Sequence, residues 1–175
     1  DFEKIEITKN KFYKNYSKSL FNPKSFFKNK KILILGPGKN LIKVSSILPE
    51  MIKKNNFLVI SLNKNSLLDS KHISYFVTCH PIKLMSKNKN VFNKKNKIIM
   101  PFSPIINNKK FFKFKKNNFD YGIKISKDKL EFKKNYAAIP EPLVLFYAIA
   151  LANSGKSKEI FVAGIDGYKF GDDRN

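Results

Sequence analysis

Short apolar runs alternate with polar connectors along this chain, and the first clear run sets the pattern. Residues 32–35 are consecutive apolar residues, as in a strand that is covered on both faces. The run stops at Gly36-Pro37-Gly38, and apolar residues then recur at a helical spacing from Leu41 to Met51. The pattern therefore predicts a buried strand, a glycine turn and a helix that closes near residues 54–56.

Further apolar runs predict the rest of a sheet. Strands are expected over residues 57–62, 73–79 and 159–163, with shorter strands over 98–100 and 121–125. A helix that is apolar nearly all round is expected to follow Pro142 and to end at Gly155. The lysine- and asparagine-rich stretches 86–97 and 107–118 are interpreted as solvated loops, although the phenylalanines of the second would also suit a lid over a site.

Alternating strands and helices of this length predict the α/β class, as a Rossmann-like three-layer sandwich with an open, mostly parallel sheet. Residues 30–175 are expected to form this domain, with the strand at 32–35 in a central position. Residues 1–29, with apolar side chains spaced as in a short helix, are interpreted as a lead-in helix or linker. The chain starts without methionine and ends just after a glycine-rich turn, so we expect a piece truncated from a longer protein.

Glycine and polar residues gather where the expected strands end. Carboxyl ends of parallel strands meet at one edge of a sheet, and ligands bind there at the point where the strand order reverses. We expect that reversal beside the strand at 32–35. The candidate binding residues at this edge are Gly36, Pro37, Gly38, Lys39, Asn40, Ser61, Asn63, Asp166, Gly167 and Tyr168, with His80 as a candidate catalytic base.

The glycine turn carries the chemical argument for this site. Glycines before a helix leave backbone N–H groups uncovered, and the helix dipole adds positive potential, so phosphate or carboxylate is expected to bind there. The alternative is that the turn needs glycine only for its shape. His80 and Asp166 have equally plain alternatives, because a histidine after a strand is often structural and an aspartate often caps a turn.

Two common nucleotide motifs are absent, and this narrows the choice of ligand. The dinucleotide fingerprint requires a glycine where Leu41 stands and an acidic residue about 20 positions after the turn. The P-loop pattern with its lysine and hydroxyl residue is also missing. A nucleotide or nucleotide-sugar is therefore expected rather than a nicotinamide cofactor, and neither a metal nor a required cofactor is expected.

Net charge invites a nucleic-acid interpretation, which the composition disfavours. The formal net charge is +22, but Arg174 is the single arginine and every other basic residue is lysine. Base recognition favours the bidentate fork of arginine, so we expect no specific nucleic-acid binding, only a weak, salt-sensitive attraction to anionic surfaces. One cysteine, Cys79, suits a reducing, cytoplasmic location. The longest apolar run, residues 143–152, is about half a membrane span, so no transmembrane segment is expected.

Several segments resemble a known family. GPGKN at 36–40, SLN at 61–63, CHP at 79–81 and above all AIALANSGKSKEIFVAGIDGY at 148–168 are similar to bacterial lipooligosaccharide sialyltransferases, glycosyltransferase family 42. The same segments resemble archaeal pterin diphosphokinase-like proteins. They also resemble Rossmann-like domains appended to aldolase-type enzymes in surface-polysaccharide gene clusters.

The resemblance implies a function and a role for some residues. Gly36, Gly38 and Asn63 would hold the nucleotide of a CMP-sugar donor, and Asp166 would lie near its cytosine or ribose, with a glycan as acceptor. Two features differ from the family. Its Ser-Gly before the alanine-rich helix is replaced by residues 140–142, Pro-Glu-Pro, and its catalytic histidine would lie beyond the last residue of this chain.

Two interpretations remain open at this point. The first is a CMP-sugar-dependent glycosyltransferase of cell-surface polysaccharide synthesis, in which His80, standing where the family has asparagine, would act as a general base. The second is a non-catalytic nucleotide- or sugar-binding domain appended to an aldolase-type enzyme. The sugar, the acceptor and the oligomeric state are not predicted.

Overall fold

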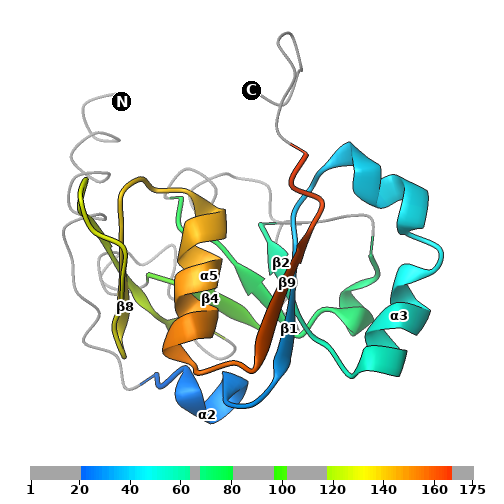
Figure 1. The fold of residues 1–175 in the computed structure, drawn as a ribbon, viewed down its shortest axis with the longest axis horizontal. Coiled ribbons are helices and arrows are strands. Elements are labelled where there is room, and N and C mark those ends of the chain that lie inside the picture. Colours follow the sequence, from blue (N-terminus) through cyan, green and yellow to red (C-terminus); the bar gives the residue numbers. More distant parts are fainter. Residues whose placement is uncertain (1–20, 64–67, 81–96, 102–117, 167–175) are drawn as a thin grey trace, which may run out of the picture.

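The main element of the fold is an open sheet of parallel strands. The structure is a computed structural model that describes residues 21–63, 68–80, 97–101 and 118–166. The sheet has the order β5-β4-β3-β2-β1-β9, and every pairing in it is parallel (Figure 1). Its strands are β1 (Lys31–Leu35), β2 (Leu58–Leu62), β3 (Tyr75–Val77), β4 (Ile98–Met100), β5 (Asn118–Asp120) and β9 (Glu159–Ala163). The predicted α/β class is confirmed.

Strand β1 is apolar throughout its buried part because both of its faces are covered. Ile32 and Ile34 point into the larger core, whereas Leu33 and Leu35 point into a smaller core on the opposite face. Side chains alternate between the faces of a strand, so a continuous apolar run serves both cores at once. This segment was predicted to be central. It is not an edge strand, since β1 lies between β2 and β9, but it is the next-to-last strand of the sheet.

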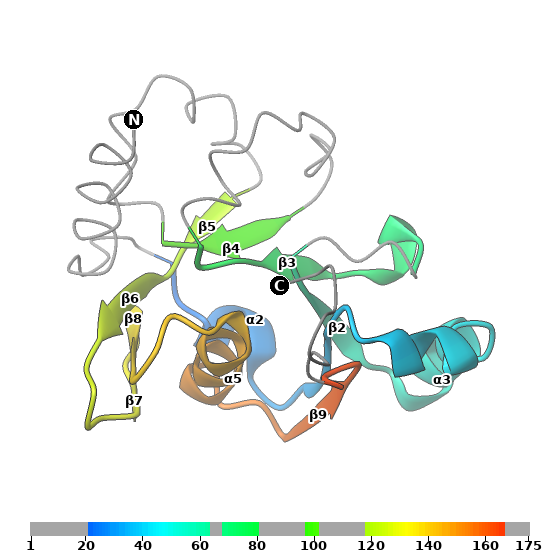
Figure 2. The same cartoon turned by 90° about the horizontal axis from the view of Figure 1, so that it is seen from above.

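Helices cover the two faces of the sheet unequally. Helices α2 (Lys24–Phe27) and α5 (Val144–Ser154) lie on the face of the larger core, and α3 (Leu48–Asn55) lies on the other (Figure 2). Gly155 ends α5 where predicted, and a Cβ there would stand 2.6 Å from Cβ of Phe27. The glycine therefore lets the end of α5 pack closely against α2.

The helix expected directly after the glycine turn begins later than predicted. A 3-10 helix, η1 (Lys39–Val44), follows the turn, and α3 starts only at Leu48. Leu41 and Leu48 are buried, but Ile42, Val44 and Ile47 are exposed. The apolar spacing that predicted a single helix therefore belongs to two separate elements. Among the described residues no helix is both long and apolar enough to cross a bilayer.

A second, smaller sheet was only partly predicted. Its strands are β6 (Gly122–Ile125), β7 (Glu131–Phe132) and β8 (Tyr136–Ile139), in the order β6-β8-β7. The strand predicted at 121–125 corresponds to β6. Neither β7, with two residues, nor β8, with two alanines, carries a strong strand pattern. The remaining 3-10 helix is η2 (Ser70–His72).

The other unpredicted strand is β5, which begins at the last residue of a stretch interpreted as a loop. The lead-in helix expected before residue 21 lies outside the described residues. So does nearly all of the two lysine-rich stretches.

Candidate functional site

The strand order places the predicted site at the junction of β1 and β9. From β1 the chain continues through β2, β3, β4 and β5 on one side, and β9 then pairs with the opposite side of β1. The strand order therefore reverses at β1, as predicted, and the carboxyl end of β1 is the topological switch point. Residues 36–40, 61–63, 80 and 166 all belong to this carboxyl edge. Gly167 and Tyr168 lie outside the described residues.

The glycine turn after β1 is hydrogen-bonded to the turn after β9. The N–H of Gly36 donates to the carbonyl of Ala163 at 2.9 Å, and the N–H of Gly38 donates to the carbonyl of Gly164 at 2.8 Å. The expectation that these two glycines leave their N–H groups uncovered is therefore wrong. The chain itself satisfies them, as buried backbone donors normally are.

Close packing explains why both positions are glycine. A Cβ on Gly36 would lie 2.4 Å from the carbonyl oxygen of Gly164, and a Cβ on Gly38 would lie 2.5 Å from the same atom. Gly164 itself adopts a left-handed backbone, with φ of 71°, which favours glycine. The glycines of both turns therefore serve the contact between β1 and β9.

Asp166 completes this contact from the β9 side. Its Oδ2 accepts the N–H of Asn40 at 2.6 Å, so the carboxylate caps the first turn of η1. A six-residue 3-10 helix separates the glycine turn from α3. The dipole of α3 consequently does not end at the glycine turn, and the electrostatic part of the anion-site prediction loses its support.

A second group of polar residues lies where β2 and β3 end. Asn63 has a left-handed backbone, with φ of 55°, and its N–H donates to the carbonyl of Val77 at 2.9 Å. The hydroxyl of Thr78 donates to Oδ1 of Asn63 at 2.9 Å, and the hydroxyl of Ser61 donates to the backbone carbonyl of Asn63 at 3.3 Å. Ser61 and Thr78 are fully buried, so both hydroxyls hold this turn in shape.

The side-chain amide nitrogen of Asn63 takes no part in this hydrogen-bond network. It has no hydrogen-bond partner among the residues that the structure describes, and Asn63 is only half-buried. Thr78 fixes the amide by binding its oxygen, so the N–H₂ group faces the other way. Sequence reasoning missed Thr78, although a hydroxyl directly after a buried strand was a usable signal.

Cys79 joins the end of β3 to the segment before α5. Its thiol donates to the carbonyl of Pro142, with Sγ 3.5 Å from the oxygen, and burial raises its pKa to about 12. The thiolate is the reactive form of cysteine, so this thiol is inert at neutral pH.

His80 does not meet Asp166. It follows β3 and is half-buried, and β2 and β1 lie between β3 and β9. Three strand spacings correspond to about 14 Å. The strand ends that carry the two residues therefore do not lie side by side at the edge.

Two buried tyrosines, one directly after β5 and one in α5, are structural. The hydroxyl of Tyr147 in α5 donates to the carbonyl of Tyr121, and the hydroxyl of Tyr121 donates to the carbonyl of Lys133 at 2.9 Å. Burial raises the pKa of both phenols. These bonds tie α5 to the second sheet and were not predicted.

Comparison with known proteins adds no assignment to this geometry. No family model, no curated protein and no solved structure matches the chain. Within the described segments, no three residues among histidine, cysteine, aspartate and glutamate form a group that could hold a metal ion.

Proposed function

We propose that the carboxyl edge of the main sheet binds the nucleotide part of a CMP-sugar donor. The chain would then be a glycosyltransferase-like domain of cell-surface polysaccharide synthesis. The observation that supports this is the reversal of strand order at β1 in an open parallel sheet. Folds of this kind bind their ligands at the carboxyl ends of the strands, at that point. The proposal includes a cytoplasmic location, which suits a chain with one buried, reduced cysteine.

The nucleotide would use different groups from those first expected. Because the N–H groups of Gly36 and Gly38 are bound within the chain, the donors left for a ligand come from side chains. Asn63, one strand away from the turn, offers its amide nitrogen to a ribose hydroxyl or a base edge. Lys39, exposed on the turn, offers positive charge to the phosphate.

The second candidate is a non-catalytic nucleotide- or sugar-binding domain appended to an aldolase-type enzyme. The separation of the strand ends that carry His80 and Asp166 favours it, because a general acid and a general base that act together must meet at one point. In both cases the partners are a nucleotide-sugar and a glycan. Attraction to anionic surfaces stays weak and sensitive to salt.

Calorimetric titration of the chain with CMP, a CMP-sugar, UDP, GDP and inorganic phosphate tests the binding, with Asn63→Asp as the decisive variant. Aspartate tolerates the left-handed backbone and can still accept the hydroxyl of Thr78, so the turn should persist. The donor is lost and a negative charge is added. We expect nucleotide affinity to fall by about tenfold or more.

Asn29→Asp is the matched control. Asn29 is also left-handed, with φ of 60°, and it precedes β1 at the opposite edge of the sheet. The same change of charge there should leave nucleotide affinity within about twofold. No binding by the parent chain, or equal binding by both variants, would refute the site. Binding of the CMP-sugar without any release of its sugar, in the presence of glycan acceptors, would favour the second candidate.

A further inference from the structure

Strand β9 is an edge strand of the main sheet, and its exposed side chains are unusually apolar. No described strand pairs with its second edge, and Figure 2 shows β9 at the border of the sheet, with α5 to one side of it and α3 to the other. Phe161 is 42% exposed and Val162 is 45% exposed, although both belong to the centre of the strand. The strand contains neither proline nor lysine, the residues that usually protect an open edge.

The hydrogen-bonding groups on this edge follow from the pairing with β1. The N–H of Gly36 donates to the carbonyl of Ala163 at 2.9 Å, in register with the pairing of Leu35 and Ala163, so Ala163 directs its backbone groups toward β1. Successive residues of a strand direct them to alternate sides. The backbone groups of Phe161 and Glu159 therefore also face β1, whereas Ile160 and Val162 direct their N–H and carbonyl groups outward, where another strand can bind them.

We propose that β9 pairs antiparallel with β9 of a second copy of this chain, centred on Phe161, so that the two main sheets become one continuous sheet. A two-fold axis through Phe161 places that residue opposite its own equivalent. Glu159 then lies opposite Ala163 of the other copy. Ile160 lies opposite Val162 of the other copy, and Val162 lies opposite its Ile160. These two outward-directed pairs, one on each side of the non-hydrogen-bonded Phe161 pair, form about four main-chain hydrogen bonds.

The side chains match in this register. The two Phe161 rings lie side by side on the α3 face, where Phe161 already packs edge-to-face on Phe57, with ring centroids 5.0 Å apart. Val162 lies opposite Ile160 of the other copy on the α5 face. Aromatic and β-branched pairs of this kind stabilise neighbouring antiparallel strands. The pairing therefore covers the exposed apolar side chains of both copies.

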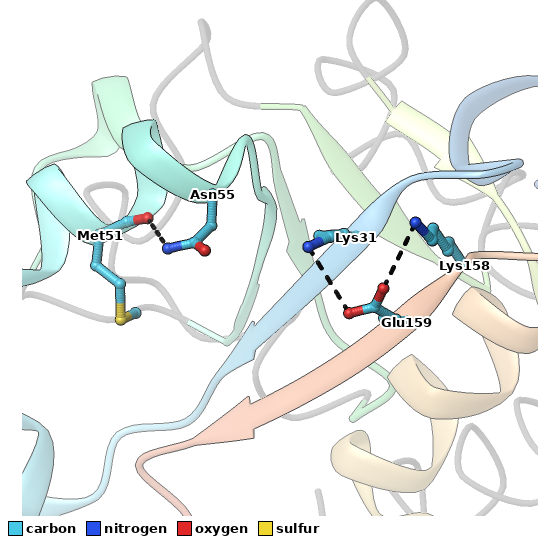
Figure 3. A network of polar contacts seen from close by, with 5 residues as sticks. All are labelled: Lys31, Met51, Asn55, Lys158 and Glu159. Atoms are coloured by element: carbon cyan, nitrogen blue, oxygen red, sulfur yellow. Dashed lines mark hydrogen bonds and ion pairs between the residues drawn. The ribbon is translucent and has the colours of Figure 1, made fainter.

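The charges at the ends of β9 favour the antiparallel direction. At the start of the strand, Glu159 lies between two lysines, with 3.9 Å to Nζ of Lys31 and 3.8 Å to Nζ of Lys158 (Figure 3). That end carries excess positive charge. The other end leads into Asp166. An antiparallel copy brings Lys158 of one chain beside the Gly164–Asp166 turn of its partner, at both ends of the interface, whereas a parallel copy would place like charges together.

Sedimentation equilibrium of the full 175-residue chain tests the pairing, with Phe161→Lys as the disrupting variant. The substitution places two ammonium groups at the two-fold axis, so the dimer dissociation constant should rise at least tenfold. Phe132→Lys in β7 is the matched control, because Phe132 is 41% exposed and also lies in a strand. It should leave the dissociation constant within about twofold.

Cross-linking gives a second measurement that does not depend on how well Phe161→Lys folds. Residues opposite each other in a non-hydrogen-bonded antiparallel pair have Cα atoms about 4.5 Å apart, a distance that a disulfide spans. Phe161→Cys should therefore form a covalent dimer under mild oxidation, and Phe132→Cys should not. The native Cys79 is buried and stays out of the reaction.

Three results would overturn the proposal. They are a parent chain that stays monomeric up to high concentration, a dimer that Phe161→Lys does not weaken, and cross-linking at position 132 as fast as at position 161. A dimer that survives Phe161→Lys would have to use another surface.

Discussion

Two neighbouring junctions at the carboxyl edge of this sheet use polar groups in opposite ways. Where β1 meets β9, the backbone N–H groups of Gly36, Gly38 and Asn40 are bound by the last residue of β9 and by the turn after it. Where β2 meets β3, buried hydroxyls bind the oxygens of Asn63, and its side-chain amide nitrogen stays without a partner in the described part of the chain. The first junction is closed by the chain itself, and the second presents a fixed donor.

The difference shows what a glycine-rich turn at a strand end does and does not imply. Glycines let backbone approach something closely, but that something can be a ligand or another segment of the same chain. Here it is the turn at Gly164. A ligand site at this edge must therefore rest on side chains, of which Asn63 is the best placed.

The largest expected effect is that of Gly38→Val on stability. The backbone of Gly38, with φ of −63° and ψ of 144°, suits any residue, so the cost comes from contact alone. The new Cβ would lie 2.5 Å from the carbonyl oxygen of Gly164 and 2.6 Å from Oδ2 of Asp166. We expect a loss of about 3 kcal/mol, and a melting temperature lower by about 6–12 °C in calorimetry.

Pro37→Ala is the control, since Pro37 lies between the two glycines but is exposed. It should change the melting temperature by only a few degrees. A Gly38→Val variant that melts like the parent would mean that the turns after β1 and β9 are not packed together in solution.

Much of the fold was predictable because short local patterns in the sequence determine several of its elements. The segment at 32–35 is an unbroken apolar run, and a strand covered on both faces permits little else. The apolar residues 160–163 also marked β9, although this strand is only partly covered. Gly155 marked the end of α5 for a similarly local reason. By contrast, β7 and β8 depend on pairing with each other and with β6, which two alanines and a two-residue strand do not reveal.

The site was harder to predict, since its chemistry depends on which segments meet. The turn residues were correctly placed at the switch point, but the sequence around Gly38 does not say that the carbonyl of Gly164 takes its N–H group. Nor does the order of strands along the chain show that β2 and β1 separate His80 from Asp166. Both facts arise from long-range pairing.

The next effect concerns the β2–β3 junction at high pH. The pKa of Cys79 is raised from 9.0 to about 12 by burial, so the folded chain keeps a proton that the unfolded chain releases above pH 9. Fewer protons on the unfolded state mean that the free energy of unfolding falls as pH rises from about 9 to 12. At pH 10 the loss should be about 1 kcal/mol.

Comparison with Cys79→Ala isolates this contribution. The ionisation of lysines and tyrosines is common to both chains, so it cancels when the free energies of unfolding at pH 8 and pH 10 are subtracted for each. Denaturant titrations should show a steeper loss for the parent. Equal losses would show that the thiol is accessible in the folded chain, and that the contact between β3 and the segment before α5 is open.

The smallest effect, that of Asp166→Asn, distinguishes the two roles open to this carboxylate. Asparagine keeps an oxygen that can accept the N–H of Asn40, so the turn should persist and stability should fall by only about 0.5 kcal/mol. The negative charge is lost. If Asp166 only caps η1, a nucleotide phosphate bound near Lys39 meets less repulsion in the variant. The affinity measured by calorimetry should then rise slightly, more at low salt than at high salt.

If the carboxylate instead accepts a hydrogen bond from ribose or cytosine, as the resemblance to sialyltransferases implies, affinity for nucleotides should fall while affinity for free phosphate does not. The structure favours the first result, because Oδ2 is already used within the chain. A fall confined to nucleotides would show that the closed β1–β9 junction also takes part in binding.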